Sequence, residues 1–270
     1  MAYSAQLYTV RDAVEADLPD AVRRLAEIGF TQVEPYDFVA RAEEFAAAFA
    51  ENGITAPSGH APLLTADQDE IFAAANRLGI GIVIDPYIPA EHWRDPEAIQ
   101  ETATRLNAAT RKAAEHGVRA GYHNHWWEFT SKVRGTTALE YFAGLLDPEV
   151  VLEIDAYWAV VGGEDPLALL ERLGDRVVAL HIKDGPVHGA NVERLVNAER
   201  LIPEDYALAA KAQQPAGQGE VGVWGAVIDA ATTLEVAVVE FDDYSADIFD
   251  GLSASLRYLE ALAVDWESPK

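Results

Sequence analysis

The chain has no cysteine and a single methionine among its 270 residues. Without cysteine there is no disulfide framework, and any metal site must be built from nitrogen and oxygen ligands. No apolar run approaches the roughly 20 residues needed to span a bilayer. The opening stretch MAYSAQLYTVRD also lacks the basic and apolar regions of a secretory signal. We therefore expect a cytoplasmic protein that has no membrane partner.

Basic residues are scarce as well. Lysine and arginine number 20 against 45 aspartates and glutamates, and the formal net charge is -25. Such an acidic surface repels phosphate backbones, so we expect no nucleic-acid partner. No Gly-x-Gly-x-x-Gly follows the first predicted strand, which leaves a dinucleotide-binding fold without support. The sequence has no glycine-rich phosphate cradle either, so it does not imply a phosphorylated substrate.

The feature that recurs along the chain is a helical run that ends in glycine, followed by a β-branched or aromatic stretch. Glycine just past a helix takes the left-handed conformation that closes the last turn. Asp95-Pro96 and Asp165-Pro166 mark helix starts. The stretches after the glycines are mostly apolar, as expected of parallel strands covered by helices. We predict eight strands, at residues 5–11, 31–36, 54–60, 80–86, 118–125, 150–156, 176–183 and 235–242.

Eight alternating strand and helix units predict a single-domain α/β fold, a closed (β/α)8 TIM barrel that covers residues 1–270. An open doubly wound sheet is the alternative. The longest stretch that reads as irregular, residues 185–222, lies between the last two strands and is too long for an ordinary connection. We expect it to be an active-site loop region that covers the substrate.

The chemistry of a TIM barrel lies at the carboxyl ends of its strands, and polar residues follow the predicted strands in this chain. Side chains alternate between the two faces of a strand. If Leu152 and Ile154 face the helices, Asp155 therefore faces the barrel axis. The same alternation gathers Asp155, His181, Glu240 and one or both of His123 and His125. Such a set suits a divalent ion, since converging carboxylates repel unless a cation bridges them. The alternative is a hydrogen-bonded polar cluster around a substrate.

Six stretches, in their order and spacing, resemble blocks of the xylose isomerase-like TIM barrels. This is the sugar phosphate isomerase/epimerase superfamily, whose sequence domain is shared with endonuclease IV. The stretches are YTVRD (8–12), IGFTQVEPY (28–36), YHNHWWEF (122–129), EIDAYW (153–158), HIKDG (181–185) and GQGEVGVW (217–224). The resemblance covers essentially the whole chain. It implies a TIM barrel that acts on a small sugar or keto-sugar, in a superfamily with many homodimers.

The resemblance also implies one bound divalent ion, most often manganese. Three of the family's ligands are matched, by Asp155, His181 and Glu240. The fourth is a glutamate on the fifth strand in many relatives, where this chain has His123. Either His123 is the metal ligand in its place, or the ligand comes from elsewhere, such as Glu153 or Glu128. Because there is no sulfur ligand, magnesium, cobalt and zinc stay open besides manganese.

A metal chelated by a carbonyl and the neighbouring hydroxyl stabilises the enediolate that forms when the adjacent C–H proton is removed. His125 is the first candidate for the catalytic base, because an imidazole titrates near neutrality, and Glu34 is the second. Lys183 is expected to donate to the developing oxyanion, unless it forms an ion pair with Asp184 or Asp155. The sugar pocket is expected to be lined by His60, Trp127 and Trp158.

The same enediolate leads to two reactions. Reprotonation gives isomerisation or epimerisation, and the family favours this metal-dependent isomerase or epimerase. Loss of a group β to the carbonyl instead gives a lyase or dehydratase acting on a 3-keto-glycoside or inosose-like substrate, which the His-Asn-His version of the fifth strand resembles. A non-catalytic sugar-binding barrel is a further alternative. The scarcity of basic residues disfavours an endonuclease acting on abasic DNA.

Overall fold

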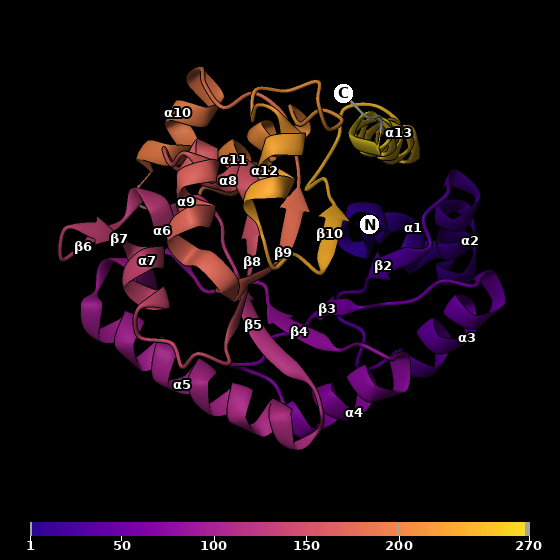
Figure 1. Cartoon of the computed structure of the whole chain (residues 1–270), viewed down its shortest axis with the longest axis horizontal. Coiled ribbons are helices and arrows are strands. Elements are labelled where there is room, and N and C mark those ends of the chain that lie inside the picture. Colours follow the sequence, from indigo (N-terminus) through magenta and orange to yellow (C-terminus); the bar gives the residue numbers. More distant parts are fainter. Residues whose placement is uncertain (1, 199, 268–270) are drawn as a thin grey trace.

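Eight parallel strands form a nearly closed barrel at the centre of the molecule (Figure 1). The computed structural model describes residues 2–198 and 200–267. The strands are β1 Tyr3–Gln6, β2 Gln32–Glu34, β3 Ser58–His60, β4 Ile82–Asp85, β5 Arg119–His123, β8 Val151–Asp155, β9 Val177–Ile182 and β10 Val236–Val239. Neighbouring strands pair in the order β2-β1-β10-β9-β8-β5-β4-β3. The predicted single-domain TIM barrel is therefore confirmed.

The ring closes between β2 and β3, the two ends of this strand order. Isolated parallel bridges join Gln32 to Thr55 and Tyr36 to His60, in place of a continuous ladder. Closing a sheet on itself removes exposed edges that would otherwise pair with other chains. The second bridge also holds His60 beside the residues that follow β2.

Helices surround the barrel on its outer side (Figure 1). The predicted starts at Asp95 and Asp165 are confirmed, since each carboxylate accepts a hydrogen bond from a backbone N–H of the first turn. Gly53 and Gly79 end their helices with φ of 65° and 74°, in the left-handed region. The helices are η1 Leu7–Val10, α1 Arg11–Ala16, α2 Leu18–Ile28, α3 Ala42–Asn52, α4 Gln68–Leu78, η2 Ala90–Arg94, α5 Pro96–Glu115, α6 Trp127–Thr130, α7 Ala138–Ala143, α8 Ala156–Val161, α9 Pro166–Leu173, η3 Gly174–Arg176, α10 Ala190–Asn197, α11 Pro203–Lys211, α12 Trp224–Ala230 and α13 Ile248–Glu267.

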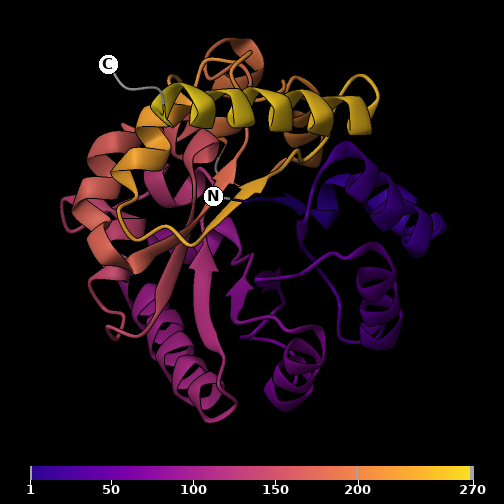
Figure 2. The same ribbon diagram turned by 45° about the vertical axis from the view of Figure 1, so that its right-hand side comes forward.

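The last helix, α13, runs along the outside of the barrel and contacts β10, η1 and α2 (Figure 2). It thereby joins the end of the described chain to its first strand–helix unit. A short hairpin of β6 Lys132–Val133 and β7 Thr136–Thr137 lies apart from the barrel. Within residues 2–198 and 200–267, no helix combines the length and apolar character needed to cross a bilayer.

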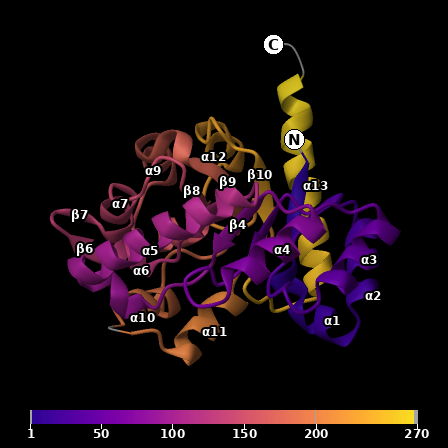
Figure 3. The same cartoon turned by 90° about the horizontal axis from the view of Figure 1, so that it is seen from below.

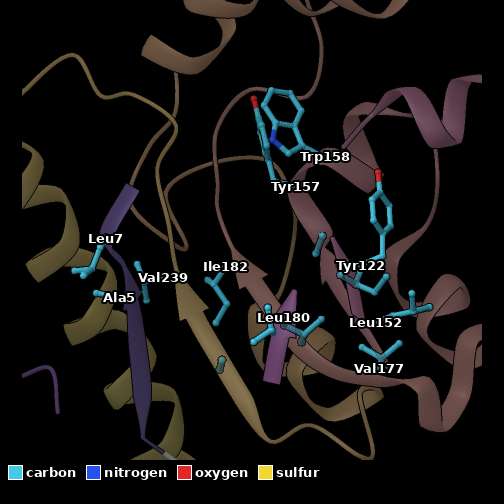
Figure 4. Packing of buried hydrophobic residues seen from close by; sticks show 14 of the residues in the cluster. Ala5, Leu7, Tyr122, Leu152, Tyr157, Trp158, Val177, Leu180, Ile182 and Val239 are labelled. Atoms are coloured by element: carbon cyan, nitrogen blue, oxygen red, sulfur yellow. The ribbon is translucent and has the colours of Figure 1, made fainter. Parts of the chain in front are cut away.

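Outward-facing strand residues pack against the helices, as the alternation of side chains predicts. Leu152, Leu180 and Ile182 are buried in the main apolar core, together with aromatic residues of the helical layer (Figure 4). Val151 and Ala179, each one position out of phase with these residues, belong to a separate small apolar cluster. The opposite phase of the strands thus faces the barrel axis, where the polar residues at the strand ends converge.

The first strand ends earlier than predicted, at Gln6 instead of residue 11. The side-chain oxygen of Gln6 accepts a hydrogen bond from the backbone N–H of Tyr8, at 3.1 Å. This bond caps η1, so residues 7–11 leave the strand and enter helix. The third and eighth strands are also shorter than predicted, at Ser58–His60 and Val236–Val239.

The fifth strand ends at His123 and not at residue 125. The side-chain amide of Asn124 bonds to the main chain of Asp155 in both directions: Oδ1 accepts from the N–H at 3.0 Å, and Nδ2 donates to the carbonyl at 3.2 Å. These two bonds replace the next rungs of the ladder between β5 and β8. His125 therefore lies in the turn after the strand.

Residues 185–222 differ from the predicted irregular stretch, because they contain α10 and α11. The two helices contact each other and lie together at one end of the molecule (Figure 3). Asp184 fixes the last part of this region, since its carboxylate accepts hydrogen bonds from the backbone of Gly217, at 2.8 Å, and from Trp224 Nε1, at 3.1 Å. That the region covers a substrate stays a prediction.

Candidate metal centre

Four buried side chains meet at the carboxyl ends of four strands. His123 ends β5, Asp155 ends β8, His181 lies near the end of β9, and Glu240 follows β10. Each offers one ligand atom, and the four atoms all lie within 4.8 Å of one another. These are the four residues that the sequence suggests as metal ligands. The structure brings them together, and their role as ligands remains a proposal.

The donor set fits a divalent cation. Asp155 Oδ1 accepts a hydrogen bond from the N–H of Trp158, which turns Oδ2 toward the cluster. That second oxygen lies 3.0 Å from Lys183 Nζ and 4.0 Å from His123 Nε2, but it accepts no well-directed hydrogen bond from the described residues. Burial raises the pKa of Asp155 to about 6, which means that the neighbouring positive charges only partly compensate its negative charge. Two imidazole nitrogens and two carboxylate oxygens suit manganese, zinc or related ions.

The far side of each imidazole faces a buried carboxylate. His123 Nδ1 lies 3.1 Å from Glu153 Oε2, and His181 Nε2 lies 2.8 Å from Glu34 Oε1 and 3.1 Å from Glu153 Oε2. His123 Nε2 and His181 Nδ1 are left for the cluster, where Nδ1 of His181 contacts Glu240 Oε2. Histidine ligands of metals usually have such a carboxylate behind them, which fixes the ring and its tautomer. Glu153 and Glu34 have the position of orienting groups.

His60 completes this inner layer and forms a second group of possible ligands with His123, Glu153 and His181. Its Nε2 lies 2.6 Å from Glu153 Oε2 and 3.1 Å from Glu34 Oε1. Burial alone would lower the pKa of His60, but the charges of these two carboxylates raise it to about 10. Burial alone would likewise raise the pKa of Glu153, but the neighbouring imidazoles lower it to about 2. Within this layer, the positive charge of His60 and the negative charges of Glu34 and Glu153 therefore compensate one another.

Glu34, the second candidate base, lies in this layer and does not line the cavity described below. It is fully buried, and its Oε1 also accepts a hydrogen bond from Gln6 Nε2 at 2.8 Å. Its neighbours lower its pKa below the usual range although burial alone would raise it. Direct contact between Glu34 and a substrate is therefore not supported by its position.

Lys183 lies among three carboxylates. Its Nζ is 3.0 Å from Asp155, 2.9 Å from Glu240 and 2.9 Å from Asp242. Of the two ion-pair partners considered from the sequence, Asp155 is contacted, and Asp184 instead holds the turn near Gly217. Burial would lower the pKa of Lys183, but the three carboxylates raise it well above its ordinary value. The ammonium group is therefore charged and committed to these pairs.

A cavity of about 490 Å³ opens above the cluster, a size that suits a small organic ligand. Two of the candidate ligands, His123 and Glu240, reach its surface. The lining consists of Tyr8, Tyr36, Asp37, His60, Ala61, Pro62, Pro86, Tyr87, His123, His125, Trp127, Leu201, Tyr206, Glu240 and Asp242. A substrate in this cavity would therefore contact both the candidate metal centre and His125.

His125 lines the cavity and stacks on Trp127. Burial lowers its pKa to about 3, and the positive charge of Lys183 acts in the same direction. The imidazole is therefore neutral at physiological pH, the form that accepts a proton. Its Nδ1 has no hydrogen-bond partner among the described residues. Glu128 does not approach the metal cluster, but accepts a hydrogen bond from the backbone N–H of His125 at 2.9 Å.

The residues expected to line the sugar pocket are only partly brought together. His60 and Trp127 line the cavity, whereas Trp158 is fully buried and does not. The indole of Trp158 packs behind the wall, 4.7 Å from that of Trp126 between centroids, because α8 begins directly after Asp155. Sequence reasoning does not identify Gln6, nor the tyrosines that line the cavity, which are Tyr8, Tyr36, Tyr87 and Tyr206. The inward phase of the first strand could indicate Gln6, but no local pattern marks the tyrosines.

Known proteins resemble this chain in sequence and in structure. A model of the xylose isomerase-like TIM barrel family matches residues 22–261. An inosose dehydratase of Lacticaseibacillus casei is 33% identical over 94 residues, which make up 34% of this chain and 30% of that relative. The chain thus matches less than a third of that relative's length.

Solved structures agree over the whole barrel. A sugar phosphate isomerase/epimerase from Parabacteroides distasonis ATCC 8503 has a TM-score of 0.76 and 20% identity, over 96% of this chain and 93% of that one. The IOLI protein, solved with a zinc atom, has a TM-score of 0.70 and 15% identity, over 100% of both chains. At these identities the likeness shows the fold alone. The family match, in contrast, covers most of the sequence, and the chain therefore belongs to the xylose isomerase-like TIM barrels.

Proposed function

We propose that this protein is a metal-dependent enzyme that removes a proton next to the carbonyl group of a sugar or keto-sugar. The observation that carries the proposal is the position of His125, a neutral imidazole on the same cavity surface as His123 and Glu240 of the candidate metal centre. The reaction needs a base and a charge-stabilising centre within reach of one small molecule. The cavity offers both.

The ion would be held by His123, Asp155, His181 and Glu240, with manganese favoured and magnesium, cobalt or zinc as alternatives. When bound, such an ion draws charge from a carbonyl and its neighbouring hydroxyl and so acidifies the adjacent C–H. Glu153 and Glu34 would orient the two imidazoles from behind.

His125 would take the proton and hold it at one of its ring nitrogens. The sequence suggests Lys183 as a donor to the substrate's oxygen, but its three ion pairs favour a different role. It would hold Asp155 and Glu240 in place and compensate their charges in part. Trp127 would fix the plane of the His125 ring and cover the apolar side of the sugar.

Among the outcomes of this proton removal, the cavity disfavours epimerisation, and we place elimination of water or an alcohol β to the carbonyl first because of the relatives. Epimerisation commonly needs a second base on the opposite face of the substrate. Among the described histidines and carboxylates of the lining, His125 alone belongs neither to the candidate ligands nor to an ion pair, apart from Asp37, which is exposed. A dehydratase among the relatives supports the same outcome.

Isomerisation is the second candidate. It needs only one base when the proton returns to the neighbouring carbon on the same face, so His125 would suffice. The sugar phosphate isomerase/epimerase from Parabacteroides distasonis shows that this fold occurs in proteins of that class. The two candidates share the proton removal and differ in whether a leaving group departs.

The test is hydrogen exchange and product analysis in deuterated water. Metal-loaded protein would be incubated with an inosose, a 3-keto-glucoside and a ketohexose. We expect deuterium at the carbon next to the carbonyl, or an unsaturated product, from at least one of them. His125→Gln should slow this by about a hundredfold or more, whereas the same change at the exposed His188 should not. Neither exchange nor product from the whole panel would contradict the proposal.

A further inference from the structure

We infer that the substrate is an uncharged glycoside whose apolar aromatic aglycone occupies the outer part of the cavity. The inference rests on the proposed function, because it places the sugar at the candidate metal centre. It adds a specificity for the aglycone that neither the family nor the relatives imply. Three properties of the cavity carry it: a division into two zones, a rim whose side chains are mostly aromatic, and the sign of its charge.

The cavity has a polar floor and an aromatic rim. The floor residues His60, His123 and Glu240 are 7%, 3% and 6% exposed, whereas Tyr8 and Tyr87 are 37% and 48% exposed. Exposure thus increases from the metal centre toward the solvent. A sugar that reaches the floor therefore points any aglycone toward the tyrosines.

The rim rings are arranged as a wall. Tyr8 meets Tyr36 edge to face, with centroids 5.3 Å apart and planes at 87°. Tyr87 meets Trp127 in the same way, at 5.7 Å and 83°. These two pairs leave aromatic faces and edges on the cavity surface, which suit an aromatic group in stacked or edge-on contact. Tyr87 and Tyr8 are large exposed apolar groups that would lose water when such a group binds.

The polar groups of the rim are mostly the hydroxyls of aromatic rings. Of the described residues that line the cavity, none is Asn, Gln, Ser or Thr, so a second sugar would depend on tyrosine hydroxyls and on Asp37. Such a sugar would bring several hydroxyl groups, and each would have to exchange its hydrogen bonds to water for one of these groups. An apolar ring carries no such cost. The composition of the lining thus favours an aromatic aglycone over a disaccharide.

The charge of the lining disfavours anionic substrates. No lysine or arginine is among the described lining residues, whereas Asp37, Glu240 and Asp242 contribute carboxylates. The nearby Lys183 is already paired with three carboxylates, and His60 is in contact with two. A phosphate or carboxylate on the substrate would therefore meet carboxylates and no cationic side chain among these lining residues. The nearby Arg11 lies over the ring of Tyr8 and donates hydrogen bonds to the backbone carbonyls of Tyr8 and Asp242.

Binding of unreactive glucosides tests the inference without requiring turnover. Isothermal titration calorimetry of the metal-loaded protein would compare phenyl β-D-glucoside, methyl β-D-glucoside, methyl β-cellobioside and glucose 6-phosphate. We expect phenyl glucoside to bind at least tenfold more tightly than each of the others. Tyr87→Ala and Tyr8→Ala should reduce this preference to less than threefold, and Leu167→Ala, which removes an exposed apolar side chain outside the cavity, should preserve it.

Equal affinities for phenyl and methyl glucoside, or no binding of either, would overturn the inference, as would tighter binding of the disaccharide or the phosphate. The outcome is separable from that of the exchange assay. If the protein prefers the phenyl glucoside but catalyses no proton exchange, the aromatic subsite is supported and the proposed reaction is contradicted. If it catalyses exchange but shows no preference for the phenyl glucoside, the proposed reaction is supported and the aromatic subsite is contradicted.

Discussion

The imidazole of His125 lies parallel to the indole of Trp127, with ring centroids 4.3 Å apart and planes 8° from parallel. This stack holds the candidate base against the cavity wall. Removing the indole should let the imidazole change its orientation, and a displacement of about 1 Å can cost about a hundredfold in rate.

We therefore expect Trp127→Ala to lower kcat between about tenfold and a hundredfold. Trp127→Phe, which keeps an aromatic face, should retain most of the activity. Steady-state kinetics on the substrate found by the exchange assay would measure both. An unchanged kcat in Trp127→Ala would show that the stack does not position the base.

Glu153 tests whether the layer behind the imidazoles orients ligands or supplies one. Its Oε2 lies 3.1 Å from His123 Nδ1, on the side away from Asp155. As an orienting group, Glu153→Gln should weaken metal affinity by about tenfold to a hundredfold and leave the stoichiometry at saturating metal unchanged. Competition with a chelator would measure the affinity, and Glu193→Gln on the surface is the matched control. Complete loss of binding at saturating metal would make Glu153 a ligand.

Glu128 should make the free energy of unfolding depend on pH. Burial raises the pKa of Glu128 to about 8, although the hydrogen bonds that it accepts from Tyr122 and His125 act in the opposite direction. A carboxyl group with a higher pKa in the folded state binds more protons there, so stability falls as pH rises from the unfolded value near 4.5 to about 8. Glu128→Gln should flatten this part of the curve. Urea unfolding at several pH values would show it, and parallel curves for both proteins would contradict the assignment.

Lys183 should matter for stability as well as for the site. Lys183→Met would leave Asp155, Glu240 and Asp242 buried without their shared cation. Removing one partner of a buried ion pair costs about 3–5 kcal/mol. Lys132→Met, which breaks an exposed pair with Glu164, should cost about 1 kcal/mol or less. Urea unfolding of the metal-free proteins would compare them, and equal costs would refute the role given to Lys183.

Much of the fold and of the metal cluster can be predicted from the sequence, because period-two alternation decides which strand residues share the barrel axis. That rule alone assigns Asp155, His181 and Glu240 to one end of the axis, where their side chains do meet. It needs no knowledge of side-chain partners, only of strand phase.

What the sequence cannot indicate depends on contacts between distant side chains. Glu34 has the chemistry of a base, but Gln6 and His181 hold it behind the metal cluster. Likewise, the early end of the fifth strand depends on Asn124, whose amide bonds to the main chain of Asp155, 31 residues away. Such pairings become visible only when the barrel is closed.

The most direct test of the account is the metal content of the purified protein, measured by inductively coupled plasma mass spectrometry. Wild type would be compared with Asp155→Ala, His181→Ala and the surface control Asp229→Ala, with circular dichroism to verify folding. We predict about one divalent transition-metal ion per chain in wild type and the control, and loss of that ion in the two folded cluster variants. A wild type that is free of metal and takes up none on addition of manganese would contradict the central claim, as would cluster variants that keep their metal.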